Sequence, residues 1–379
     1  MNRNTIVPTP SPRRLTLCVY IAMNPEKSDQ RYRELDALRG IAALSTVFFH
    51  FTLGRPEADY GFELGVTGVD LFFIISGFVI FMTINKVSST LEFAVNRFAR
   101  LYPTYWACVT LTFLLMIAVA FIAHKSHPSF YQYAANMTMF QFYFGVQDLD
   151  GPYWTMLVEM LFYICIGLLN TFGKMKYVLP IGLAAVGMTI VMDLAMDLWF
   201  PALQKVHDYF PLITHFPLFL SGIIFYKLMN ETEGKSEKPF LYSALAVCFG
   251  AALLLYDNGG KSVHFINFGQ YLCCLALYYL VFILFVHNKL GFIVNRVTLF
   301  LGKISFPLYL IQLYISINFV IPGLMKYAGF GFWPACLGAL AVLLALSAAI
   351  NYFVEVPMNR RLKTWFRRKL GFRRRPAGV

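Results

Sequence analysis

The chain is short of charge for a protein of its length. Lysine, arginine, aspartate and glutamate together make up 14% of its 379 residues, whereas hydrophobic residues make up 58%. Soluble domains have about 25% charged residues, which they need to cover their surface. This deficit, together with a mean hydropathy of +0.59, excludes the soluble globular, disordered and collagen-like classes and indicates that apolar surface faces lipid.

Cysteine patterning is also missing. None of the seven cysteines shows a Cys-x-x-Cys or Cys/His spacing, so the sequence has neither a zinc signature nor a disulfide framework. Cys18 lies near the N-terminus, and the other six lie inside apolar runs, where we interpret them as small core residues. The sequence therefore predicts no metal site.

Long apolar runs are what the chain has instead. A membrane-spanning helix needs about 20 mostly apolar residues at a rise of 1.5 Å per residue. The predicted fold is an all-α integral membrane protein with about ten transmembrane helices, over residues 35–54, 66–85, 103–123, 152–170, 177–196, 211–230, 239–256, 265–287, 299–321 and 333–356.

Two connections between these spans are long. Residues 86–102 place Lys86, Arg97 and Arg100 between apolar residues, which predicts a separate interfacial helix. Residues 124–151 are aromatic and polar, which predicts a membrane-surface segment or a lid. Neither divides the chain, so we expect one transmembrane domain over residues 31–361, preceded by a disordered tail at 1–30 and followed by a basic cytoplasmic tail at 362–379.

The N-terminal tail contains one short apolar run, from Leu15 to Ala22, directly after two arginines. It is at the short end of a signal-peptide core, and no small-x-small cleavage site follows it. Met23 offers an alternative start shortly before the first span. We therefore expect residues 1–22 to be dispensable.

The distribution of basic residues predicts orientation. With ten spans both termini share one side, and most of the 32 lysines and arginines fall on that side; the other side has Arg55, Lys125, Lys205, Lys261 and Lys326. Cytoplasmic loops are the ones enriched in lysine and arginine. We therefore expect cytoplasmic termini in a multi-pass protein of the cell (inner or plasma) membrane. The basic tail is then a contact to anionic lipid headgroups, and nucleic-acid binding is disfavoured.

Ionisable residues inside the predicted spans are few, and in a bilayer such residues mark functional sites. Arg39 and His50 are 11 residues apart on the first span, which at about 100° per residue puts both on one helix face. The alternative is that Arg39 snorkels to headgroups while His50 forms a hydrogen bond in the core.

Two carboxylates are predicted near the depth of His50. Asp70 enters the second span from the same outer side, and a buried carboxylate beside an imidazole is the arrangement of a general base. A plain interhelical polar contact is the alternative. Glu159 follows Trp154 on the fourth span and shares a helix face with Tyr163 at i+4. Together they predict a polar pocket in the outer half of the bundle.

Two basic residues followed by aromatic residues are predicted on the cytoplasmic side of the membrane. Arg97 and Arg100 are one helical turn apart, and guanidinium groups suit phosphates. Tyr105 and Trp106 follow closely and are candidates for stacking on a base. Positive-inside topology would place arginines here as well, so this motif alone is weakly specific.

Taken together, these segments resemble the transmembrane acyltransferase family known as acyltransferase 3, over about residues 31 to 361. The likeness lies in five motifs in the same order and spacing: Leu35-Asp36-Ala37-Leu38-Arg39-Gly40 with His50 eleven residues beyond Arg39, Gly68-Val69-Asp70-Leu71-Phe72-Phe73-Ile74-Ile75-Ser76-Gly77-Phe78, Arg97-x-x-Arg100-x-x-Pro103-x-Tyr105-Trp106, Tyr153-Trp154-Thr155 with Glu159, and Ser305-Phe306-Pro307-Leu308-Tyr309 with Glu355-Val356-Pro357.

The resemblance implies an acyl donor carried by coenzyme A, acetyl-CoA or another acyl-CoA used as co-substrate with no permanently bound cofactor. It also implies transfer to a hydroxyl of a glycan or lipid-linked oligosaccharide. His50, Asp70 and Arg39 would be catalytic, and Arg39, Arg97, Arg100, Tyr105 and Trp106 would bind the donor. Glu159, Trp154, Tyr163 and Gln312 would bind the acceptor. Many members have histidine at the position of Gln312, so only a neutral hydrogen bond is expected there.

We therefore expect an O-acyltransferase, and specifically an O-acetyltransferase. No hydrolase-like domain follows the tenth span, which favours the compact type that modifies exopolysaccharides or oligosaccharides over the two-domain type that acts on peptidoglycan. The alternative is a transporter or flippase for a glycolipid or small anion that uses the same buried charges as a relay. A non-enzymatic scaffold would leave those charges unexplained.

Overall fold

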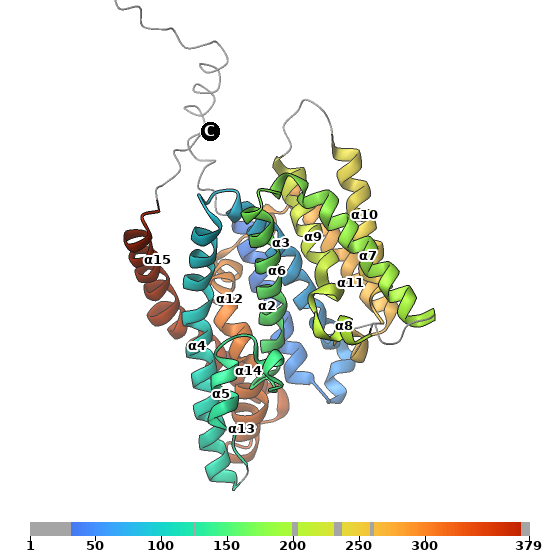
Figure 1. Ribbon diagram of the computed structural model, residues 1–379. Coiled ribbons are helices and arrows are strands. Elements are labelled where there is room, and N and C mark those ends of the chain that lie inside the picture. Colours follow the sequence, from blue (N-terminus) through green and yellow to red (C-terminus); the bar gives the residue numbers. More distant parts are fainter. Residues whose placement is uncertain (1–31, 125, 199–203, 231–236, 258–260, 373–379) are drawn as a thin grey trace, which may run out of the picture.

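The computed structural model describes residues 32–124, 126–198, 204–230, 237–257 and 261–372, and the regular elements within these ranges are all helical (Figure 1). The predicted tail at 1–30 lies outside them. The α-helices are α2 (Arg33–Thr52), α3 (Gly68–Ile84), α4 (Thr90–Ala123), α5 (Phe130–Asn136), α6 (Trp154–Thr171), α7 (Val178–Leu198), α8 (Gln204–Tyr209), α9 (Leu212–Asn230), α10 (Lys238–Leu254), α11 (Phe268–Val286), α12 (Arg296–Tyr314), α13 (Ile321–Tyr327), α14 (Phe332–Ile350) and α15 (Val356–Leu370).

Eight helical stretches in the described part are long and apolar enough to cross a membrane. They contain α3, α4, α6, α7, α9, α11, α12 with α13, and α14 with α15. The chain is therefore a multi-pass membrane protein, and the predicted all-α membrane fold is confirmed. The other two predicted spans correspond to α2, which carries Asp36, Arg39 and His50, and to α10, which has only 17 residues. The side that each terminus faces stays a prediction.

The predicted interfacial helix at 86–102 is wrong as a separate element. Residues 90–123 form one continuous helix of 34 residues, α4, with Pro103 inside it. Ser89 is the N-cap of this helix, and its hydroxyl accepts a hydrogen bond of 3.1 Å from the backbone N–H of Glu92. Proline is tolerated inside membrane helices because neighbouring groups satisfy the freed carbonyl. Arg97 and Arg100 therefore belong to a rigid spanning helix.

The segment at 124–151 packs along α4. Tyr102 donates a hydrogen bond of 3.0 Å to the carbonyl of Thr138 from α4, and Tyr133 of α5 pairs with Thr110 at 2.9 Å. Residues far apart in sequence are thereby held together beside the start of α6. The segment covers one side of the bundle, and whether it can open as a lid stays a prediction.

Glycines let two pairs of helices approach very closely. Gly40 of α2 faces Gly302 of α12, and a Cβ atom added at Gly40 would lie 2.6 Å from the backbone nitrogen of Gly302. A Cβ at Gly302 would overlap the carbonyl of Asp36. In Figure 1 the two helices lie side by side in the middle of the bundle. This crossing fixes the height of Arg39, the neighbour of Gly40, against α12.

The second close crossing joins α3 to α9. A Cβ added at Gly77 would overlap the carbonyl of Phe219, and one at Gly222 would overlap the carbonyl of Ile74. Small residues at such crossings allow backbone contact between membrane helices. The crossing locks α3, so Ser76 is held at a fixed height beside Gly77.

The C-terminal helices continue the bundle into a basic segment. A π-helical turn, Asn351–Glu355, joins α14 to α15, and the Asn351 amide donates a hydrogen bond of 3.1 Å to the carbonyl of Lys303. Helix α15 lies beside α4 (Figure 1), where the rings of Phe366 and Phe98 meet edge to face at 6.4 Å. The predicted boundary between 361 and 362 falls inside this helix.

Candidate active site

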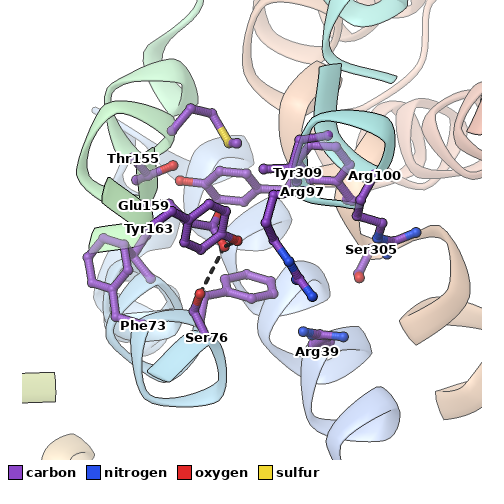
Figure 2. A pocket seen from close by; sticks show the side chains of 15 residues that line it. Arg39, Phe73, Ser76, Arg97, Arg100, Thr155, Glu159, Tyr163, Ser305 and Tyr309 are labelled. Carbon is purple, nitrogen blue, oxygen red and sulfur yellow. Dashed lines mark hydrogen bonds between the residues drawn. The ribbon is translucent and has the colours of Figure 1, made fainter. Parts of the chain in front are cut away.

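Side chains from α2, α3, α4, α6 and α12 line a cavity of about 800 Å³ inside the bundle (Figure 2). Five of the residues predicted for the site come together here. We call it the arginine cavity, and its polar lining consists of Arg39, Ser76, Arg97, Arg100, Thr155, Glu159, Tyr163, Ser305 and Tyr309.

Glu159 is held at the wall of the arginine cavity by two hydroxyl groups. Ser76 of α3 donates a hydrogen bond of 2.9 Å to its Oε1 atom, and the Tyr163 hydroxyl donates to the same oxygen. The i,i+4 spacing on α6 predicts the bond from Tyr163. The bond from Ser76 depends on how α3 packs against α6, which the spacing does not show. The two hydrogen bonds fix the position of the Glu159 carboxyl group in the lining that it shares with the three arginines.

The three arginines of the cavity are held to different degrees. Arg39 forms a weak ion pair with Asp36 at 4.0 Å, and Arg100 forms an ion pair with the buried Glu355 of the π-helical turn. Arg97 lies with its guanidinium carbon 5.9 Å from the ring centre of Tyr163, and its buried Nε atom makes no hydrogen bond within the described ranges. Figure 2 shows Arg39 and Arg97 pointing toward one another across the cavity. This arrangement suits an anion with several oxygens.

A second cavity of about 750 Å³ contains the predicted catalytic pair. Its lining includes Thr46, His50, Asp70, Trp154, His215, Ser262, Phe265 and Tyr309, and we call it the histidine cavity. His50 is 11 residues from Arg39 on α2, or about 16 Å along the helix axis. The two cavities therefore follow one face of α2, as the spacing predicts.

Aromatic rings form much of the wall of the histidine cavity. The ring centre of His215 lies 5.3 Å from that of Trp154 and 4.9 Å from that of Phe73. Asp70 is 6% exposed, and its Oδ2 atom is buried without a hydrogen bond among the residues that the structure describes. His50 and Asp70 line the same cavity. A hydrogen bond between them stays a prediction.

Val69 and Tyr309 line both cavities. They therefore form the wall between the arginines and His50. Tyr309 is 8% exposed, and its ring packs edge to face against Phe72 with 5.5 Å between centres. No other residue is common to the two linings, so the cavities adjoin at these two side chains.

Three predicted site residues lie away from both cavities. Tyr105 is fully buried and packs against Tyr153 at 5.3 Å. Trp106 donates a hydrogen bond of 2.8 Å from Nε1 to the carbonyl of Met137. Gln312 is buried behind the histidine cavity, and its Oε1 accepts a hydrogen bond of 3.2 Å from Thr46.

Sequence reasoning missed Asp150, which joins α6 to α12 next to the histidine cavity. Its carboxylate accepts hydrogen bonds from the backbone N–H groups of Gly151 at 2.8 Å and Tyr314 at 3.2 Å. Burial raises the pKa of Asp150 to about 7, and the two N–H groups act in the opposite direction. The available signal was its place before Gly151-Pro152 at a helix start.

Three residues of the cavity linings were also missed, for different reasons. Ser76 and Tyr309 lie within motifs of the resemblance, but only the packing shows which cavity each faces. His215 was visible as an ionisable residue inside a span. Its place opposite Trp154 depends on how α9 packs on α6.

A cavity lined by three arginines adjoins a cavity lined by a histidine and a carboxylate, and both lie between the helices of a membrane bundle. The family of the acyltransferase domain matches residues 32–352 of the chain. The chain therefore belongs to the acyltransferase 3 family and is a membrane acyltransferase, which decides against the transporter alternative.

Several known proteins are similar to the chain over part or most of its length. ORF330 of Acidianus two-tailed virus, whose name assigns it only provisionally as an acetyltransferase, is 24% identical over 332 residues, covering 86% of this chain and 89% of that protein. The O-acetyltransferase OatA of Staphylococcus aureus is 26% identical over 364 residues, covering 86% of this chain but 57% of OatA. Nodulation protein 10 of Rhizobium leguminosarum is 28% identical over 168 residues, covering 38% of this chain and 46% of that protein. No solved structure gives a significant match.

Proposed function

We propose that the protein transfers an acetyl group from acetyl-CoA to a hydroxyl group of a glycan. The observation that carries the proposal is the pair of adjoining cavities along one face of α2, one with three arginines and one with His50 and Asp70. The name of OatA as an O-acetyltransferase supports the acyl group and the oxygen acceptor. Because the chain spans little more than half of OatA, the acceptor is inferred from the cavity and not from that relative.

The arginine cavity is the proposed donor site. Arg39, Arg97 and Arg100 would bind the phosphate groups of the donor, with Glu159 and Tyr163 holding Arg97 in place. The thioester arm would then pass Val69 and Tyr309 to reach His50. We therefore assign Glu159 and Tyr163, expected as acceptor ligands, to the donor side instead.

The chemistry is proposed for the histidine cavity. His50, oriented by Asp70, removes the proton of the acceptor hydroxyl while the hydroxyl oxygen attacks the thioester carbonyl. The carbon–sulfur bond then breaks, and the thiolate of coenzyme A leaves and takes the proton from the imidazolium. One histidine with a carboxylate partner suffices for this route. A transient acyl-histidine is the alternative.

The acceptor site is proposed beside Trp154. A sugar ring can stack on the indole while its hydroxyl points at His50, and Gln312 would position this wall through Thr46. A glycan or lipid-linked oligosaccharide fits a cavity with aromatic walls. Trp154 and His215 are the aromatic pair that such a ring would meet.

The proposal is tested by labelled donor and by product mass. Purified protein in lipid nanodiscs should bind acetyl-CoA, and surface glycans of cells expressing the chain should gain the mass of one acetyl group over cells with empty vector. Label that stays on the protein after a short pulse would support the acyl-histidine route over the general base. A protein that neither binds coenzyme A nor alters any glycan would overturn the proposal.

A further inference from the structure

Helix α15 is attached firmly to α4 beside the arginine cavity. Phe366 of α15 packs edge to face on Phe98 of α4 at 6.4 Å, and α15 contacts one part of the longer α4 (Figure 1). The preceding π-helical turn is tied to α4 as well, because its Glu355 pairs with Arg100. The basic face of α15 is therefore held at a defined place and does not simply trail from the bundle.

This packing brings four cationic side chains together. Lys363 is half-buried and interacts electrostatically with Arg97 and Arg100 of α4 and with Arg367 one turn along α15. Arg100 has a carboxylate partner, but the Nε atom of Arg97 is buried without a hydrogen bond among the described residues. Like charges at short range repel, more strongly where water is scarce. A polyanion placed among them would relieve the repulsion.

Lipid headgroups are the other occupant that a basic helix could have. Arg361, two residues before Lys363, points about 160° away around the helix and is exposed. Exposed basic residues of that kind can reach lipid. Lys363 is half-buried and interacts with Arg97 and Arg100, so it faces α4 and the two arginines that line the arginine cavity.

We propose that Lys363 is a donor-binding residue that contacts the phosphate groups at the nucleotide end of the acyl donor. This inference rests on the proposed function and adds α15 as a further wall of the donor site. The cluster of Arg97, Arg100, Lys363 and Arg367 then surrounds the phosphates from two helices. Deeper parts of the donor would lie along Arg39.

The test compares two variants of α15 in nanodiscs, each of which replaces one basic residue by neutral glutamine. Lys363→Gln should raise KM for acetyl-CoA about tenfold with kcat unchanged, because one charge-assisted contact is lost in substrate and transition state alike. Arg361→Gln removes the same charge from the other face and should change KM less than twofold. Lys363→Arg should restore most of the affinity.

A truncated donor separates a phosphate contact from a structural effect. Acetyl-pantetheine has no phosphate groups, so wild type and Lys363→Gln should use it equally well. A penalty that persists with this donor would overturn the proposal, since it would show a role in folding or packing. Thermal unfolding of both variants, expected to match wild type, checks the same point.

The lipid reading is distinguished by bilayer composition. If Lys363 bound lipid, both variants would behave alike, and their defects would appear with phosphatidylglycerol nanodiscs and vanish in pure phosphatidylcholine. That result would overturn the proposal. The proposed function and the role of Lys363 are overturned by different results. If the wild-type protein does not bind acetyl-CoA, the proposed function is wrong. If the wild type binds it and Lys363→Gln has an unchanged KM, only the role of Lys363 is wrong.

Discussion

The two cavities along α2 differ in the charges and ion pairs of their linings. In the arginine cavity, Glu159 receives two hydrogen bonds, Arg100 has a buried carboxylate partner, and Arg97 lies near the Tyr163 ring, although its Nε atom has no hydrogen bond among the described residues. In the histidine cavity, Asp70 keeps a buried oxygen without a hydrogen bond in the described part of the chain. The walls there are rings, such as Trp154 beside His215.

This difference indicates a division between binding and reaction. Charges fixed by partners cost little further ordering when an anion arrives, so they suit recognition of a donor. A carboxylate held in an apolar place can influence a neighbouring imidazole strongly, because few other groups compete for it. The comparison therefore predicts that substitutions in the histidine cavity change kcat, whereas those in the arginine cavity change KM.

The largest effect is expected for His50→Ala. Loss of a general base lowers kcat by about 100- to 10,000-fold, measured as acetyl transfer at saturating donor. His215→Ala is the matched control, because this histidine lines the same cavity, and it should cost tenfold at most. Equal losses in both variants would show that the cavity needs two histidines, and a fully active His50→Ala protein would remove the catalytic assignment.

The next effect is expected for Arg97→Gln. One guanidinium that binds phosphate contributes about 1.5 to 3 kcal/mol, so KM for acetyl-CoA should rise about ten- to a hundredfold while kcat changes little. Lys326→Gln, an exposed residue on α13, controls for the loss of charge. A fall in kcat at unchanged KM would contradict the division between a binding cavity and a reaction cavity, because Arg97 would then act in the transition state.

A smaller effect is expected at the shared wall. Tyr309→Ala should join the two cavities and raise the use of butyryl-CoA relative to acetyl-CoA several-fold, since extra methylene groups gain room. The ratio is measured in one preparation, so a lower folded fraction does not alter it. Tyr309→Phe keeps the ring and should leave the ratio within twofold of wild type. An unchanged ratio in the alanine variant would mean that other residues determine the selectivity for acyl chain length.

Periodicity along single helices was readable from the sequence. The spacing of Arg39 and His50 predicts one face of α2, and both do line cavities along that helix. The spacing of Glu159 and Tyr163 predicts their hydrogen bond. These predictions hold because they need only the geometry of one helix.

Contacts between helices were not readable in this way. The predicted span begins at Pro103, a residue type that fits the first turn of a helix, whereas α4 begins at Thr90 with Ser89 as its N-cap. The signal was present in Ser89-Thr90-Leu91-Glu92, the Ser-x-x-Glu pattern of a capped helix start. The place of Tyr309 between the cavities depends on how α12 crosses α2 at Gly302, which no local pattern specifies.

The smallest effect concerns Trp106, where sequence and structure lead to different expectations. Sequence reasoning expects its ring to stack on the donor, yet Nε1 donates to the carbonyl of Met137 and the ring packs on Tyr102 at 5.5 Å. Trp106→Phe should therefore leave KM for acetyl-CoA within twofold of wild type. It should lower stability by about 1 kcal/mol, because one hydrogen bond to the 124–151 segment is lost. Steady-state kinetics and thermal unfolding measure the two quantities. A several-fold rise in KM with unchanged stability would return Trp106 to the donor site and extend the arginine cavity's role along α4.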